Sequence, residues 1–243
     1  MIHALATVRS GKKISYNQAF HRIVGMLPAP SELHRYLLGE KGESSMEINL
    51  NTLPARDAHD LLTSALIPRP IAWVSSVSAQ GHINLAPFSF FSGITWCPAT
   101  LGFSVVNRPD GSRKDTIRNI EETKNFVVNM VSQDLASRMV ETSATFPHGI
   151  NEAQKAGVPL VQSTVVIAPR VKEARVAFEC ALDRVVTVGN GAYAGNLVLG
   201  TILLVHIKDE LLEAGKTVDP IRFDVIGRLS GTRYCRTGSV FEI

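Results

Sequence analysis

The sequence predicts a mainly β protein with short helices. Six or more segments are rich in β-branched and aromatic residues, and Gly, Pro, Asn and Asp cluster between them. The helical patterns are few and short, and the chain contains no internal repeat or low-complexity tract. Strands in this proportion favour a closed or nearly closed barrel.

The first 46 residues differ from the rest of the chain. They contain six Lys or Arg and three Glu, so they carry the whole formal charge of +3, and the remainder is balanced. We expect residues 1–46 to be a flexible N-terminal extension and residues 47–243 to be the folded domain, because Pro28 and Pro30 break the first pattern and residues 39–45 resemble a linker. Residues 1–31 lack acidic residues and weakly resemble an organelle transit peptide. A tail or a translated upstream segment is the reading we favour.

The body opens with a helix and a hairpin. Apolar residues at spacings of three and four predict a helix over residues 55–65. A compact apolar strand then begins at Ile71, and Ser78-Ala79-Gln80-Gly81 turns the chain into a second strand. Pro87 cannot donate to a strand ladder, so we expect regular pairing to end near it.

Further elements follow the same pattern of short segments. We expect Gly189-Asn190-Gly191 to form a tight turn between the last two long strands. The expected strands cover residues 100–106, 126–131, 164–167, 174–188, 197–208 and, at an edge, 220–226; the expected helices cover 115–123, 133–142 and 151–156.

The strongest candidate for an anion site is Arg113-Lys114-Asp115-Thr116. Two cations precede a predicted helix start, Asp115 or Thr116 can cap that helix, and the first amides of the helix are free to bind an anion. Such a site would hold a phosphate by charge and by oriented amides. The same residues would also suit a solvated helix start with a surface cation pair.

Four segments in the same order resemble the flavin-reductase-like family, and the resemblance covers roughly residues 47–243. They are Arg69-Pro-Ile-Ala-Trp-Val-Ser-Ser76, Asn84-Leu-Ala-Pro-Phe-Ser-Phe-Phe91, Arg113-Lys-Asp-Thr-Ile-Arg-Asn-Ile120 and Gly227-Arg-Leu-Ser-Gly-Thr-Arg-Tyr234. The resemblance implies an FMN-binding split β-barrel, usually a homodimer. It also implies that the segment with Arg228 and Tyr234 approaches the flavin or the dimer partner; a loop capping the barrel end is the alternative.

The resemblance implies where FMN would bind. The phosphate would lie at the Arg113–Thr116 segment, and the isoalloxazine ring would lie along residues 84–91. Backbone amides near Ala86 and Phe88 would bind the polar ring edge, and Phe90 would pack beside the ring. The residues expected to bind the cofactor are Asn84, Ala86, Pro87, Phe88, Ser89, Phe90, Arg113, Lys114, Asp115 and Thr116.

The implied activity is hydride transfer from NAD(P)H to the flavin, with the flavin performing the redox chemistry. Many flavin reductases carry an Asp-Lys-Phe triplet where this chain has Asn151-Glu152-Ala153. That departure keeps a second hypothesis open, an FMN carrier or sensor without turnover. A weaker third is a hydrolase or esterase on the same barrel.

Composition excludes other classes. The balanced body does not suit nucleic acid, and no apolar run reaches the ~20 residues of a membrane helix. The histidines are scattered, and the three cysteines form no Cys-x-x-Cys, so we expect no metal site. Unpaired cysteines suit a reducing compartment, and we expect a cytoplasmic protein.

Overall fold

The computed structural model describes residues 5–7, 13–15, 46–147, 149–213 and 217–243. By its internal contacts the chain divides into two units, residues 1–62 and 63–243. In the first, β1 (Leu5–Thr7) pairs antiparallel with β2 (Lys13–Ser15), and η1 (Leu50–Thr52) follows an Asn49 cap. Helix α3 (Ala55–Ala65) crosses the division and confirms the predicted helix. The predicted boundary after residue 46 stays a prediction, and most of the extension lies outside the described residues.

The second unit is built on a seven-stranded antiparallel sheet with the order β4-β3-β7-β10-β11-β6-β5. Edge strands β4 and β5 are joined by Ser89 and Phe90 alone, so the sheet must curl until its two edges approach. Phe90 O accepts a hydrogen bond of 2.9 Å from Ser104 N of β6, which joins that connection to the far end of the sheet. The strands are β3 (Ala72–Val77), β4 (Ile83–Phe88), β5 (Phe91–Trp96), β6 (Ala99–Val106), β7 (Asn125–Met130), β10 (Val176–Val188) and β11 (Gly195–Ile207).

Strand β3 is buried along its whole length because both of its faces are covered. Its Ala72 and Val74 belong to the core with Phe88, Phe103 and Phe126, whose neighbouring ring centroids lie 5.4 Å apart. Trp73 belongs to a second core against α5 (Ala136–Glu141) and α6 (Glu152–Lys155), and its Nε1 donates to Thr142 Oγ1 at 2.9 Å.

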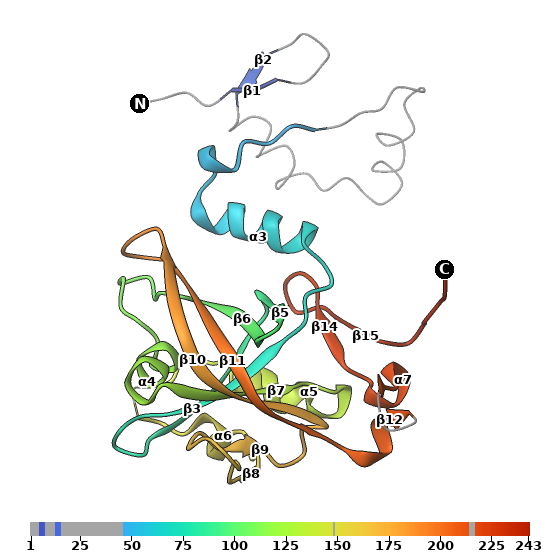
Figure 1. The fold of residues 1–243 in the computed structure, drawn as a ribbon. Coiled ribbons are helices and arrows are strands. Elements are labelled where there is room, and N and C mark those ends of the chain that lie inside the picture. Colours follow the sequence, from blue (N-terminus) through green and yellow to red (C-terminus); the bar gives the residue numbers. More distant parts are fainter. Residues whose placement is uncertain (1–4, 8–12, 16–45, 148, 214–216) are drawn as a thin grey trace. The chain divides into compact units, whose positions relative to one another are not determined.

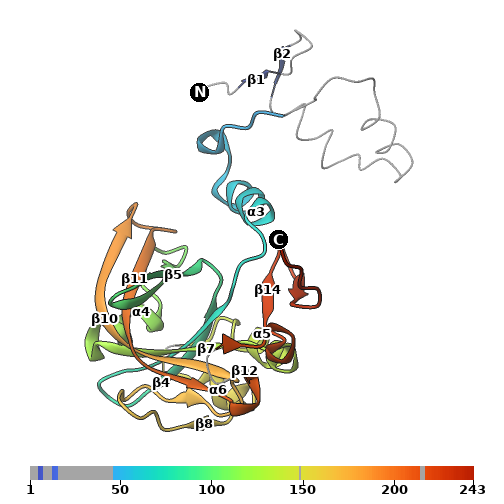
Figure 2. The ribbon, with the colours of Figure 1, turned by 45° about the vertical axis from the view of Figure 1, so that its right-hand side comes forward.

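The long hairpin of β10 and β11 runs along one side of the barrel in both views (Figures 1 and 2). It requires a glycine at position 200. A Cβ there would overlap the ring of Phe126 and would lie 2.8 Å from its Cε1 atom. The expected tight turn is instead a connection over residues 189–194, with Gly189 and Gly191 at positive φ.

Short elements cover the outside of the sheet. Helix α4 (Asp115–Thr123) packs against β3, and α6 (Glu152–Lys155) packs against β4. Both were expected, and the expected helix over 133–142 is divided into η2 (Gln133–Leu135) and α5 (Ala136–Glu141). The remaining elements are β8 (Leu160–Val161), β9 (Arg170–Val171), η3 (Asp209–Leu211), β12 (Leu212–Glu213), β13 (Thr217–Val218), α7 (Pro220–Phe223), β14 (Ile226–Arg228) and β15 (Tyr234–Arg236).

Two predicted strands were wrong. Residues 164–167 form bends, because the Glu179 carboxylate accepts from the amides of Thr164 and Val165 and replaces a ladder partner. Residues 220–226 begin as helix α7, because Asp219 caps its first amides and Pro220 suits the first helical position.

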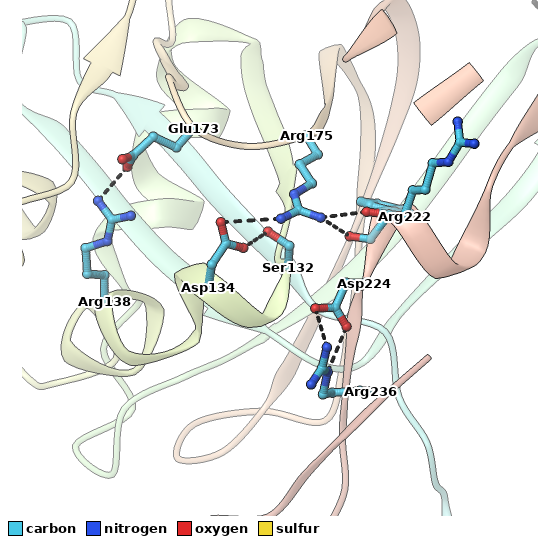
Figure 3. Close-up of polar contacts among 9 residues, drawn as sticks. Ser132, Asp134, Arg138, Glu173, Arg175, Arg222, Asp224 and Arg236 are labelled. Atoms are coloured by element: carbon cyan, nitrogen blue, oxygen red, sulfur yellow. Dashed lines mark hydrogen bonds and ion pairs between the residues drawn. The ribbon is translucent and has the colours of Figure 1, made fainter. Parts of the chain in front are cut away.

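A group of charged residues attaches the C-terminal segment to the barrel (Figure 3). Arg175 donates to the carbonyl oxygens of Arg222 at 2.6 Å and Phe223 at 3.3 Å, and its guanidinium lies 3.6 Å from the Asp134 carboxylate. Nearby, Asp224 accepts two hydrogen bonds from Arg236, at 2.8 and 2.9 Å. Every cation named here has a partner, so this group holds structural elements together.

Candidate functional site

The first feature of the candidate site is the contact between β4 and the start of α4. Asn84 of β4 and Thr116 of α4 share a side-chain hydrogen bond of 2.9 Å. The Lys114 ammonium lies 5.8 Å from the centroid of the Phe88 ring. Two segments that the sequence marked separately are therefore side by side.

The start of α4 has no side-chain cap from its N-cap residue. Lys114 is that residue, its backbone is extended, and its side chain makes no capping hydrogen bond. Asp115 and Thr116, which carry the first amides, are both buried. Uncapped amides and the helix dipole together favour a negative charge here.

Lys114 supplies the cation of this site. Its side chain is half-buried, and among the described residues it has no ion-pair partner. Burial lowers the pKa of the Lys114 ammonium, and the charge of Arg108 lowers it further. A cation held in this way gains stability from any anion that reaches it.

Arg113 is engaged elsewhere. Its guanidinium forms an ion pair with Glu121 and lies 3.4 Å from Asn196 Oδ1. Arg108, which the sequence reasoning missed, donates to the Arg113 carbonyl at 2.5 Å and lies 3.7 Å from the Asp115 carboxylate. The sequence shows three cations at positions 108, 113 and 114. Only the folded loop shows that Arg108 lies close to Lys114.

The second feature of the site is the connection from β4 to β5. Ser89 Oγ accepts from Arg69 Nε at 3.3 Å, and the Arg69 guanidinium lies 5.9 Å from the centroid of the Phe90 ring. Arg69 is buried and also donates to the carbonyls of Thr63, Leu66 and Leu229. Arg69 therefore fixes the segment on which Ser89 and Phe90 lie, a role that sequence reasoning missed.

Pro87 lies within regular pairing, which corrects the expectation that the ladder ends near it. The register of β4 with β3 continues from Ile83 through Pro87 to Phe88. The backbone amide of Leu85 donates to Glu152 on α6, so this amide points away from β3. Because amides alternate in direction along a strand, the backbone nitrogen of Pro87 points the same way. The missing N–H of proline is thus on the open edge, where it costs no ladder bond. The same alternation turns the amides of Ala86 and Phe88 toward β3.

The third feature is Glu152, the first residue of α6. It is buried, and its carboxylate accepts from Leu85 N at 3.0 Å. Burial raises the pKa of the Glu152 carboxyl, hydrogen bonds from its own amide and from the Leu85 amide lower it, and the charge of Asp115 raises it again. Asn84 and Asp115 also line a cavity of about 10 Å³, which is room for about one water and far too little for a ring.

The hairpin of β14 and β15 reaches the same region. Arg69 and Arg228 exchange two backbone hydrogen bonds, of 2.9 and 2.7 Å, and the Arg228 guanidinium lies 4.8 Å from the Tyr234 ring centroid. This hairpin therefore approaches the Arg69 end of the site.

The part of the chain that the structure describes offers little for other chemistries. It holds no group of three or more His, Cys, Asp or Glu that could bind a metal, and no helix long and apolar enough to cross a membrane. A second cavity, of about 340 Å³, is lined by Asp134, Lys172, Glu173, Arg175, Lys208 and Glu210. It contains none of the predicted site residues.

Comparisons with known proteins agree with this geometry. The sequence profile described as "Flavin reductase like domain" matches residues 64–222. An uncharacterised protein of Aquifex aeolicus is 40% identical over 191 residues, which cover 79% of this chain and 95% of the relative.

Two solved structures are also similar. Nitrilotriacetate monooxygenase component B from Bacillus cereus has a TM-score of 0.79 and 34% identity, covering 83% of this chain and 100% of its own. A 2-nitrobenzoate 2-nitroreductase from Pseudomonas fluorescens has a TM-score of 0.74 and 33% identity, covering 82% and 95%. The expected split-barrel fold is confirmed.

Proposed function

Because this chain belongs to the flavin reductase-like family, we propose that it is an FMN-binding oxidoreductase that transfers hydride from NADH or NADPH to its flavin. The observation that carries the proposal is the half-buried Lys114 ammonium at the uncapped start of α4, 5.8 Å from Phe88. A phosphate and an aromatic ring in one ligand would satisfy both features.

The residues of this chain fit the phosphate of FMN. Lys114 would supply charge, the first amides of α4 would donate, and the Thr116 hydroxyl would add a donor. Asp115 is negative, but the guanidinium groups of Arg108 and Arg118 balance it. Arg108 adds positive charge where the sequence had suggested Arg113.

The fit to the ring rests on the other side of the site. Phe88, Ser89 and Phe90 would line the ring, and Arg69 would hold Ser89 and Phe90 in place. Pro87 would lie at the edge of β4 that faces away from β3. Bound FMN would supply the redox chemistry by accepting two electrons from the nicotinamide, while the protein positions both molecules.

Two relatives support an oxidoreductase. One is named as a component of a monooxygenase and the other as a nitroreductase. In this chain the reduced flavin would accordingly serve a partner protein or a small electron acceptor. The three cysteines are free, which fits our proposal of a cytoplasmic protein.

We also propose a homodimer. Edge strand β5 exposes Ile94 and Trp96, and the Trp96 side chain is 91% exposed. An exposed apolar edge strand is a natural pairing surface. Light scattering after gel filtration tests this: we expect a dimer that Trp96→Asp weakens, and a monomeric wild type would contradict it.

An FMN carrier without turnover is the second candidate. The observation that favours it is Glu152 within Asn151-Glu152-Ala153, whose carboxylate is bonded inward to Leu85 instead of being exposed for a substrate. Both candidates share the same flavin site.

Anaerobic mixing of the purified FMN-loaded protein with NADH, and separately with NADPH, distinguishes the candidates. We expect the flavin absorbance near 450 nm to bleach within seconds with at least one donor. A flavin that stays oxidised with both donors, yet bleaches with dithionite, would favour the carrier. A protein that binds no flavin would contradict both.

A further inference from the structure

Asn84 lies between a carboxyl group and a hydroxyl group at the start of α4. Asn84, Glu152 and Thr116 are 6%, 8% and 1% exposed and come from β4, α6 and α4. Because bulk water barely reaches this group, each hydrogen bond within it restricts the next one.

One orientation of the Asn84 amide satisfies these neighbours when Glu152 is ionised, and the reverse orientation does so only when Glu152 carries a proton. In the first, Nδ2 donates to Glu152 Oε1 at 3.1 Å, and the Asn84 oxygen accepts from Thr116 Oγ1 at 2.9 Å. In the reverse orientation, Nδ2 donates to Thr116 Oγ1 at 2.9 Å, and the Asn84 oxygen is turned toward Glu152.

The protonation of Glu152 selects between these orientations. An ionised carboxylate only accepts, so Asn84 must donate to it and must accept the single hydroxyl proton of Thr116. A neutral carboxyl can donate to the Asn84 oxygen. Asn84 Nδ2 then donates to Thr116 Oγ1, and the Thr116 proton becomes available to a ligand.

We propose that Glu152 is a positioning residue that acts through Asn84 and decides whether the Thr116 hydroxyl donates to Asn84 or to a ligand. When an anion binds at the start of α4, Glu152 therefore takes up a proton. The inference rests on the proposed function for the identity of that anion as the FMN phosphate. No bond to the flavin ring is involved.

The charged groups around Glu152 favour this coupling. Burial and the charge of Asp115 on α4 raise the pKa of the Glu152 carboxyl, whereas its own amide and the Leu85 amide lower it. His82, before β4, lines the small cavity together with Asn84 and Asp115. Lys114 is directed to the Phe88 ring. Glu152 thus lies near a negative group and forms no ion pair among the described residues.

Calorimetric titration with FMN in phosphate-free buffers of different ionisation enthalpy measures the proton uptake directly. For the wild type we expect uptake of up to one proton and an FMN affinity that falls by up to about tenfold per pH unit as Glu152 ionises. The phosphate of FMN itself titrates near pH 6, but this contribution is common to all variants.

Glu152→Gln is the decisive variant, because the amide of Gln would donate to Asn84 and still accept from Leu85. We expect it to lose the Glu152-dependent proton uptake and to bind FMN at high pH more tightly than the wild type. Thr116→Val, which keeps Glu152, should also lose the uptake while binding FMN more weakly. Riboflavin, which lacks the phosphate, should show no uptake with any variant.

Proton uptake equal in the wild type and Glu152→Gln would overturn the inference and leave the proposed function intact. If no variant binds flavin, the proposed function fails, and the same titration with inorganic phosphate decides the inference. Phosphate binding with uptake that Glu152→Gln abolishes would support it, and no binding or no difference would overturn it.

Discussion

Glu179 and Glu152 are both buried glutamates, and each accepts from backbone amides, yet His206 lies beside the first and Asp115 beside the second. Glu179 is completely buried and accepts from Thr164 N at 2.7 Å, Val165 N at 2.6 Å and His206 Nε2 at 2.6 Å. Burial by itself would raise the pKa of Glu179, but these donors outweigh burial and lower it. The balance at Glu152 is the reverse, and its pKa is raised.

This difference in surroundings distinguishes a carboxylate that stabilises the fold, Glu179, from one that lies in the candidate site, Glu152. Around Glu179 the loop of residues 164–167, β10 and β11 supply donors to an ionised carboxylate, so its charge is matched by the fold. Around Glu152 the fold supplies two amides, its own and that of Leu85, together with Asn84, but it also places the negative Asp115 close by. Lys114, the residue before Asp115, carries a cation that has no ion-pair partner among the described residues. Incomplete matching of charge marks the place where a ligand completes the structure.

The largest effect should come from removing the matched carboxylate. Glu179→Ala leaves two amides without an acceptor, and we expect it to lower the free energy of unfolding by about 3–5 kcal/mol. Urea unfolding measures this. FMN affinity of the folded fraction should not change, and a loss below about 1 kcal/mol would show that Glu179 is not structural.

The next effect concerns the unmatched cation. Lys114→Ala should raise the Kd for FMN about 10- to 100-fold, since a charge-assisted hydrogen bond contributes about 1.5–3 kcal/mol. Arg113→Ala is the matched control, because its partner is Glu121, and we expect less than about fivefold. Flavin fluorescence titration measures both, and equal losses would contradict the geometry described above.

The two glutamates should also give opposite dependences of stability on pH. The raised folded pKa of Glu152 makes stability fall as pH rises from the unfolded value of 4.5 through the folded value. The lowered folded pKa of Glu179 makes stability fall as pH drops from 4.5 through its folded value.

Urea unfolding across a pH series checks these signs, with a slope of at most about 1.4 kcal/mol per pH unit for each proton. Glu152→Gln should flatten the curve above pH 4.5, and Glu179→Gln should flatten it below. Curves that shift in the opposite sense would refute the assigned surroundings.

The smallest effect should come from the Asp224–Arg236 pair of Figure 3. The Arg236 side chain is largely exposed, so its paired charge is screened by solvent. We expect Arg236→Ala to leave both the free energy of unfolding and the FMN affinity nearly unchanged. A large loss of stability in a thermal unfolding experiment would mean that the C-terminal segment holds the barrel together.

The elements with strong local signals could be predicted from the sequence. Helices 55–65 and 115–123 have the predicted bounds, because apolar spacing is a local property. The strands predicted over residues 164–167 and 220–226 were wrong. In the first segment the distant Glu179 carboxylate replaces strand pairing, and in the second the Asp219 cap starts a helix.

The candidate site was predictable as two segments but not as a network. Asn84 contacts Thr116, and Lys114 lies near the Phe88 ring. Both contacts depend on the curvature of the sheet, which no sequence motif encodes. Arg69, Arg108 and Glu152 acquire their contacts through the barrel, so the resemblance alone did not select them. The proposed flavin contacts of the ten predicted residues stay predictions.

Comparing FMN with riboflavin, in the wild type and in Lys114→Ala, tests the central assignment most directly. If the flavin phosphate binds at the start of α4, FMN will bind the wild type at least about tenfold more tightly than riboflavin, as expected for a charge-assisted contact. Lys114→Ala will then remove most of that preference and leave riboflavin affinity unchanged. A preference for FMN that survives the substitution would place the phosphate elsewhere.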